Sequence, residues 1–450
     1  SSAPMQGRTS RSSDLPAKTG RELAARVLFR VLDEDAWASP ALDGELSRAR
    51  LSPGESGRAT DLVYGVLRVL PALEAEIDRH RPRRDPIEPF TRACLLTASY
   101  ELLHTVEKPW AILDETVGLV RRTRAEGLSR FANAVLRKIA NARPASPARP
   151  RALVLPAWLE ALLVSDLGPE RARAFAAERP MPPPTTLRAR VPRDLLVAAI
   201  REVRPEAELT LGAMSAHAIL ARGVGDPRRL PGFDRGELTM MDEASQLVAQ
   251  AVGARPGERV LDACAGRGGK TLALLDDMDG RGALVACDDH PEKLLRMDDE
   301  LRRLGRSPES VEKRAVDLAV GLGGIAEASF DRVLVDAPCT GLGTVHRRPE
   351  ILLRVGPDDV PRMQALQRAI ARNAARLVQP GGLFVYAVCS PTRSEGIGVV
   401  EPLAREVGLE LLREPIGTIS PDADGVVRLG PWCDPAASCD AFQIARFRKR

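Results

Sequence analysis

Residues 260–271 read VLDACAGRGGKT, an apolar run that ends in an acid and is followed by a glycine-rich turn and the start of a helix. The glycines let the backbone turn tightly and approach a ligand closely, with amide groups at the helix N-terminus facing it. A phosphate-binding loop of the GxxxxGKS/T kind is excluded because Cys264 stands where its first glycine is required. The dinucleotide pattern GxGxxG also fails, because Thr271 occupies the position of its third glycine. The stretch therefore predicts a nucleoside-binding turn.

Around this turn, predicted strands alternate with predicted helices from about residue 236 to residue 450. The strands are expected at 259–264, 283–288, 311–317, 330–338, 382–389 and 440–447, and the helices at 270–278, 291–304, 360–377 and 394–406. Such alternation predicts a doubly wound, Rossmann-like α/β domain with helices on both faces of the sheet. Ligands of these sheets bind beyond the carboxyl ends of the strands.

Two acids end successive strands of the predicted sheet. Asp288 lies about 20 residues beyond the glycine turn, where an acid commonly holds a ribose hydroxyl, and Asp317 ends the following strand, where it could hold an adenine amino group. This order of groups fits S-adenosylmethionine better than NAD. No metal site is expected, because the chain has no CxxC pair and its five histidines are scattered.

Cys339 and Cys389 each follow a predicted strand at the same edge, and Asp336 precedes the first of them. Two thiols and an acid beside a methyl-donor pocket suggest methylation of cytosine, whose carbon 5 becomes nucleophilic when a thiolate adds to carbon 6. A proton donor near the ring nitrogen would stabilise the developing charge, and a base would later remove the carbon 5 proton. The spacing leaves open which thiol attacks.

The other five of the seven cysteines do not indicate a disulfide framework. Cys94 and Cys287 lie inside apolar runs and are interpreted as small core residues. Cys433 and Cys439 have no assigned role.

The N-terminal part has a different pattern, because apolar stripes at the helical period recur from residue 19 to 142 and predict an all-α bundle. From Arg121 to Arg151, both included, the sequence contains nine basic residues and only one acidic residue, Glu126. This excess of positive charge suggests either a solvated helix face or a phosphate-contacting surface. We expect a disordered tail at 1–18, a Pro/Ala/Arg linker at 143–152, a mixed α and β segment at 153–235 and the catalytic domain at 236–450.

Composition limits the class of protein. Of the 450 residues, 44% are hydrophobic and 28% are charged, and the net charge is only +4, so any nucleic-acid surface must be local. No stretch of 18 uncharged apolar residues exists, so no membrane span is expected. Together with the absence of a signal-peptide pattern, this predicts a cytoplasmic protein, which we expect to be a monomer.

Three longer motifs resemble those of the RsmB and Nop/Sun family of RNA cytosine-5 methyltransferases. DACAGRGGKT (262–271) is similar to the methyl-donor loop of the family, DAPCTGLGTVHRRPEI (336–351) to its fourth motif and YAVCSPTRSEG (386–396) to its sixth. The helical part looks like a NusB-type RNA-binding domain, with YGVLR (64–68), YELLHT (100–105) and NAVLRK (133–138). The likeness covers nearly all of residues 20–450.

This resemblance implies a division of labour between the two thiols. Cys389 would be the nucleophile, and Cys339 would assist release of the covalent adduct as a base or through a water. Asp336 would face the cytosine ring nitrogen or the methyl donor, and Lys270 would line the same pocket. The implied donor-binding residues are Cys264, Ala265, Gly266, Arg267, Gly268, Gly269, Lys270, Asp288, Asp317 and Asp336. The implied substrate is small-subunit ribosomal RNA, with transfer RNA as an alternative.

Departures from the family pattern keep two other functions open. Gly266 and Arg267 replace the usual Ala-Pro of the donor loop, and Val388 replaces a threonine before the nucleophile. A catalytically impaired RNA-binding or ribosome-assembly scaffold is one alternative. The other is a DNA cytosine-5 methyltransferase, in which the thiol of the Pro-Cys motif attacks, but the chain lacks the Glu-Asn-Val motif of those enzymes.

Overall fold

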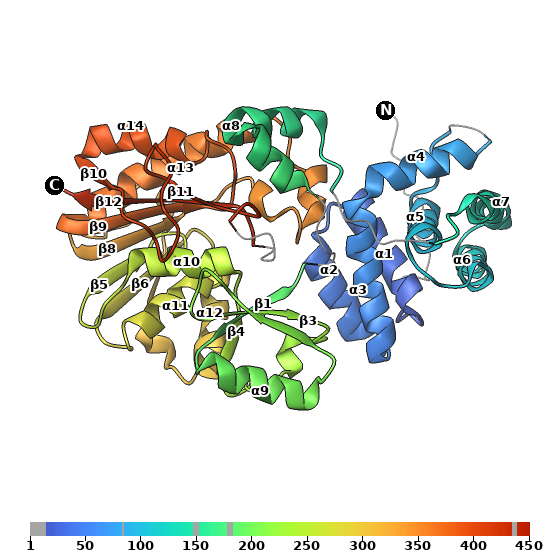
Figure 1. Ribbon diagram of the computed structural model, residues 1–450, viewed down its shortest axis with the longest axis horizontal. Coiled ribbons are helices and arrows are strands. Elements are labelled where there is room, and N and C mark those ends of the chain that lie inside the picture. Colours follow the sequence, from blue (N-terminus) through green and yellow to red (C-terminus); the bar gives the residue numbers. More distant parts are fainter. Residues whose placement is uncertain (1–14, 83–84, 147–152, 178–182, 434–438) are drawn as a thin grey trace, which may run out of the picture. The chain divides into compact units, whose positions relative to one another are not determined.

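The computed structural model describes residues 15–82, 85–146, 153–177, 183–433 and 439–450. They form two compact units, the first built from α1–α7 and the second from the elements that begin with α8, except that Arg347–Glu350 group with the first (Figure 1). Most of the tail predicted at 1–18 and of the linker predicted at 143–152 lies outside the described residues. Ala17 is buried in the helical core, so this core includes a residue before position 19.

The first unit is the predicted all-α bundle. Its helices are α1 (Gly20–Asp33), α2 (Ala38–Arg48), α3 (Pro53–Arg68), α4 (Leu70–His80), α5 (Pro89–His104), α6 (Pro109–Thr123) and α7 (Glu126–Ala142). Thr19 and Ser52 cap α1 and α3, because each hydroxyl accepts the backbone N–H of a glutamate three residues later. Helix α5 is buried on most of its surface and contacts α1, α3, α4, α6 and α7, so it forms the centre of the bundle.

The second unit begins with a helix and a small antiparallel sheet. Helix α8 (Ala157–Ala176) is interrupted at Gly168, where φ is 79°. The sheet has the strand order β2-β3-β1-β4, and helix α9 (Arg193–Val203) follows β1 in the chain. The strands are β1 (Thr185–Ala189), β2 (Glu208–Leu211), β3 (Ala218–Arg222) and β4 (Leu238–Met240). This is the α and β segment expected before the catalytic domain, although β4 lies beyond the expected boundary at residue 235.

A larger mixed sheet fills the rest of the unit, in the order β10-β12-β9-β8-β5-β6-β7, with β11 beside β12. Its strands are β5 (Arg259–Asp262), β6 (Ala283–Asp288), β7 (Glu312–Ala315), β8 (Phe330–Asp336), β9 (Val378–Val388), β10 (Leu409–Leu412), β11 (Val427–Leu429) and β12 (Phe442–Lys449). The pairs between β7 and β9 are parallel, whereas β12 runs antiparallel to its neighbours. The chain moves outward from β5 to β7 and returns to β8, so the order reverses between β5 and β8.

Helices cover both faces of this sheet (Figure 1). They are α10 (Glu243–Val252), α11 (Gly269–Asp277) and α12 (Pro291–Arg303) on one face, and α13 (Asp359–Leu377) and α14 (Ile397–Val407) on the other. Strand β9 shows the alternation that two buried faces require, since Leu383 and Val385 belong to one core and Phe384 and Tyr386 to the other. The predicted doubly wound fold is confirmed. In the described part of the chain, no helix is both long enough and apolar enough to cross a membrane.

Candidate active site

Several predicted site residues, among them Asp336 and Cys389, lie where the strand order reverses. Asp262 ends β5 and Asp336 ends β8, and these two strands are hydrogen-bonded neighbours in a parallel ladder. Asp336 in turn pairs with Ala387 of β9, two residues before Cys389. The carboxyl ends of β5, β8 and β9 therefore present their side chains at one edge, which is where ligands of doubly wound folds bind.

The glycine turn leads from β5 into α11 in the way the sequence predicts. Gly266 and Gly268 have φ values of 55° and 91°, a region that favours glycine, and Gly268 is the N-cap of α11. A Cβ on Gly268 would lie 2.6 Å from Cγ of Met297, so the side chain of this α12 residue would have to move before a larger residue could occupy position 268. Arg267 is exposed and is not among the residues that line the adjoining cavity.

Asp288, at the end of β6, is hydrogen-bonded to the glycine turn. Its carboxylate accepts the backbone N–H of Gly266 at 2.9 Å and of His290 at 3.0 Å, and Lys293 donates at 3.3 Å. Burial alone would raise the pKa of Asp288, but these hydrogen bonds outweigh it and lower that pKa, so the group is ionised. Asp317 follows β7, is exposed and accepts the backbone N–H of Ala319 at 2.8 Å.

A cavity of about 250 Å³ opens beside the turn. It is lined by Met240, Met241, Asp242, Ser245, Asp262, Cys264, Ala265, Gly269, Lys270 and Asp336. Lys270 Nζ donates to Asp336 at 2.6 Å. Burial alone would lower the pKa of Lys270, but the negative charges around it, that of Asp336 foremost, together outweigh burial and raise that pKa, so the ammonium is retained. The cavity thus combines three acids with one paired cation.

The two thiols meet although they are 50 positions apart. Sγ of Cys339 lies 3.2 Å from Sγ of Cys389, within hydrogen-bonding distance, and both residues are half-buried. The pKa of the Cys339 thiol is raised well above its usual value by its hydrogen bond to Cys389 and by burial. Lys270 lies close enough to Cys389 for their charges to interact.

Two buried acids at this edge are not among the predicted site residues. Asp262 is 1% exposed, and burial raises its pKa to about 6, although the Thr271 hydroxyl donates to it at 2.7 Å. The sequence does contain a feature that marks Asp262 as a candidate, because Asp262 ends a strand just as Asp288 and Asp336 do. Glu395 is fully buried between the loops of the two thiols, and no spacing rule marks it.

Asp288, Asp289 and His290 are, among the described residues, the one group of potential metal ligands whose ligand atoms lie close together. The Asp288 carboxylate is already bonded to two backbone amides, so we assign no ion to the group.

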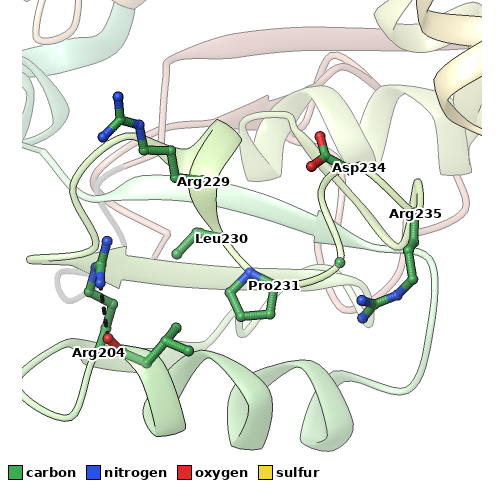
Figure 2. Close-up of a pocket in the computed structure, with 8 residues that line it drawn as sticks. Arg204, Arg229, Leu230, Pro231, Asp234 and Arg235 are labelled. Atoms are coloured by element: carbon green, nitrogen blue, oxygen red, sulfur yellow. Dashed lines mark hydrogen bonds between the residues drawn. The ribbon is translucent and has the colours of Figure 1, made fainter.

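A second pocket lies in the small-sheet part and contains none of the predicted site residues (Figure 2). Arg229 and Arg235 lie on opposite sides of Pro231 in it (Figure 2). Arg235 forms two hydrogen bonds with Glu237, at 2.7 and 2.8 Å, and Arg204 donates to the carbonyl of Val203. These arginines do not converge on one point, so we assign no ligand to this pocket.

Two solved structures share the fold. The crystal structure of PH0851 matches with a TM-score of 0.79 at 21% identity, and the match covers 96% of this chain and 99% of that one. A methyltransferase homologue from Pyrococcus horikoshii is 26% identical with a TM-score of 0.54, over 64% of this chain and 94% of the other. The first match spans both the helical unit and the unit that carries the thiols.

Sequence comparison assigns both parts of the chain. The family model described as 16S rRNA methyltransferase RsmB/F matches residues 249–448, and the NusB family model matches residues 18–141. A ribosomal RNA small subunit methyltransferase B from Thermus thermophilus is 33% identical over 96% of this chain and 98% of its own length. Another, from Pseudomonas syringae, is 32% identical over 86% and 87%. The chain therefore belongs to the RsmB/F family of S-adenosylmethionine-dependent methyltransferases, with a NusB-family domain at its N-terminal side.

Proposed function

We propose that this protein forms 5-methylcytosine in small-subunit ribosomal RNA, in the cytoplasm, through a covalent bond between Cys389 and carbon 6 of the base. The observation that carries the proposal is the pair of thiols 3.2 Å apart at the ends of β8 and β9. The names of the relatives, ribosomal RNA small subunit methyltransferase B, support the choice of RNA. Exposed arginines on α6 and α7 of the NusB-family domain support an RNA partner as well.

The residues around the cavity fit the methyl donor. S-adenosylmethionine carries an ammonium and a sulfonium, and the cavity is lined by Asp242, Asp262 and Asp336. Oδ1 of Asp262 is buried and, within the described part of the chain, has no hydrogen-bond partner, so it can accept one from a ligand. Asp288 would hold the ribose and Asp317 the adenine amino group. When bound, the donor supplies an electrophilic methyl group.

Cys389 starts the reaction in this proposal. Carbon 5 of cytosine is a poor nucleophile until another group adds to carbon 6, and a thiolate adds there more readily than a thiol. Lys270 retains its proton and so keeps a positive charge near Cys389. As the new sulfur–carbon bond forms, negative charge moves into the ring toward its nitrogen, and carbon 5 becomes the nucleophile. Asp336 faces that nitrogen or the donor.

Cys339 completes the reaction. After carbon 5 has gained the methyl group, its proton must leave so that the electrons of that bond can expel Cys389 as a thiolate. We assign this step to Cys339, either directly after its own proton has passed to solvent or through a water. Because the pKa of Cys339 is raised by its hydrogen bond to Cys389 and by burial, its thiolate is a strong base once formed.

Two alanine variants test these roles. Cys389→Ala should abolish methylation and leave no covalent RNA adduct, because it removes the attacking group. Cys339→Ala should accumulate a protein–RNA adduct that survives denaturing gel electrophoresis, because release is blocked. Cys433→Ala, at a half-buried thiol that donates to the carbonyl of Arg428 and not to a second thiol, should methylate normally without an adduct. An adduct in the first variant and none in the second would reverse the two roles.

The substrate and the donor need separate measurements. Bisulfite sequencing of total RNA with and without the gene should reveal one cytosine in small-subunit ribosomal RNA whose methylation is lost; a lost site in transfer RNA would refute the ribosomal assignment.

Calorimetry should detect binding of S-adenosylmethionine. A folded preparation that binds RNA but no donor would favour the scaffold alternative suggested by Gly266-Arg267.

A further inference from the structure

A buried carboxylate joins the loops that carry the two thiols. Thr340, which follows Cys339, donates its backbone N–H to Oε1 of Glu395 at 2.8 Å and its hydroxyl to Oε2 at 2.6 Å. Ser390, which follows Cys389, donates its hydroxyl to the same Oε2. One carboxylate is therefore bonded to the residue next to each thiol.

Other groups complete this arrangement. The Thr392 hydroxyl donates to Oε2 of Glu395 at 3.1 Å, and Nε2 of Gln367 donates to Oε1 at 3.0 Å. Gln367 also donates to the carbonyl of Pro338, immediately before Cys339, at 2.9 Å. The Tyr386 hydroxyl donates to the backbone carbonyl of Glu395 at 2.7 Å. The backbone of Glu395 is thus held from β9, and its carboxylate from α13 and from both loops.

The free-energy cost of burying the Glu395 carboxylate indicates a role other than stabilising the fold. Glu395 has no exposed surface, and all five groups that donate to its carboxylate are neutral. In the described part of the chain the hydrogen-bond partners of its carboxylate include no basic side chain. A buried carboxylate without a cation is expensive even when its hydrogen bonds are complete, and an apolar side chain would serve packing alone at lower cost.

We propose that Glu395 is a positioning residue for methyl transfer, which holds the Cys339 loop against the Cys389 loop and keeps Cys339 as the thiol that donates a hydrogen bond to Cys389. The inference rests on the proposed function. The pKa of Cys339 is raised first by its hydrogen bond to Cys389, then by burial, and then by the negative charges of Cys389 and Glu395. Glu395 therefore fixes the separation of the two sulfurs through its bonds to both loops, and its charge adds to the causes that keep the proton on Cys339.

The variant Glu395→Gln tests the inference, because it keeps the size of the side chain and one acceptor oxygen but removes the charge. We expect kcat for RNA methylation to fall about 100-fold, as a small misplacement of reacting groups would cause, with donor affinity within about twofold of wild type. We also expect Cys339, followed by mass spectrometry, to react with iodoacetamide at lower pH than in the wild type. A purely structural role would not change that pH profile.

Glu243→Gln is the matched control. Glu243 is also fully buried, and it accepts the backbone N–H groups of Met214 and Ser215 at 2.8 and 2.9 Å. This variant should lose stability but leave the alkylation profile of Cys339 unchanged. If Glu395→Gln does not fold, the variant Thr340→Val tests the inference instead. It removes the hydrogen bond from the Thr340 hydroxyl to Glu395 and keeps the charge of Glu395. It should lower kcat about tenfold with an unchanged alkylation profile.

Two results would overturn the inference. One is a Glu395→Gln variant with wild-type kcat and wild-type alkylation of Cys339, and the other, should that variant not fold, is a Thr340→Val variant with wild-type kcat. Failure of the proposed function is distinguishable, because it requires that the wild type itself forms no 5-methylcytosine. The alkylation measurement needs neither RNA nor methyl donor, so it reports on Glu395 in either case.

Discussion

Asp262 links the ionisation of the site to the stability of the fold. Its carboxyl is buried at the end of β5, and burial raises its pKa to about 6, against a usual value near 3.9. The folded protein therefore binds this proton more tightly than the unfolded chain does. The resulting stability is fully present below pH about 4 and is lost as the pH rises to about 6, a difference of about 3 kcal/mol at most.

The variant Asp262→Asn should remove this pH dependence. Asparagine keeps an oxygen for the Thr271 hydroxyl but cannot ionise. We expect wild type and variant to melt at similar temperatures near pH 4, and the variant to be the more stable of the two above pH 6. Thermal melts monitored by circular dichroism measure the difference, with Asp234→Asn, at an exposed carboxyl, as the control. Parallel pH profiles for wild type and Asp262→Asn would contradict the prediction.

The positions of the two thiols could be predicted from the sequence, because each follows a strand and adjacent parallel strands end at one edge. Their distance could not be, since it depends on the register of β8 with β9. The role of Glu395 could not be predicted for a similar reason. Its donors come from residues 340, 367, 390 and 392, and only the folded chain brings them together.

The predicted strands and helices of the large sheet are confirmed, among them β5 and β7, which have only four residues each. Strands β10 and β11, with four and three residues, were not predicted. Segments of that length contain too few residues to establish alternation, and β10 and β11 do not lead to a strand-end acid as the segments of β5 and β7 do. The strand order could be anticipated only as doubly wound, and the small sheet could not be assigned at all, because its strands are short and pair with partners distant in sequence.

The contact between Gly268 and helix α12 gives a prediction about the donor turn. In Gly268→Ala the new Cβ would meet the side chain of Met297, at a φ of 91° that already disfavours alanine. We expect a loss of stability together with at least a tenfold loss of donor affinity by calorimetry, because the turn must move. Gly257→Ala isolates the backbone effect, since Gly257 has a φ of 89° and open space around it. That control should cost about 1–2 kcal/mol of stability and leave donor affinity unchanged.

The whole chain has a net charge of only +4, but its basic residues are unevenly distributed. On α6 and α7, Arg121, Arg122, Arg130 and Arg137 are exposed. Arg124, although part of the same predicted basic stretch, bonds to Glu88 at 2.7 Å and lies over the ring of Phe90, so it supports the bundle. Two further members of the stretch, at positions 149 and 151, lie outside the described residues.

Arg130 and Arg137 are two turns apart on α7 and so share one face of the helix. If they contact RNA phosphates, the variant Arg130→Ala/Arg137→Ala should weaken RNA binding to a similar extent for every sequence. The slope of log affinity against log salt should become shallower by about 1.5, because about 0.7–0.9 of a counterion is released per phosphate contact. At saturating RNA, kcat should not change, because both residues lie outside the unit that holds the thiols. Arg48→Ala/Arg50→Ala makes the same charge change at the end of α2, and equal salt slopes for the two double variants would show that α7 has no special contact with RNA.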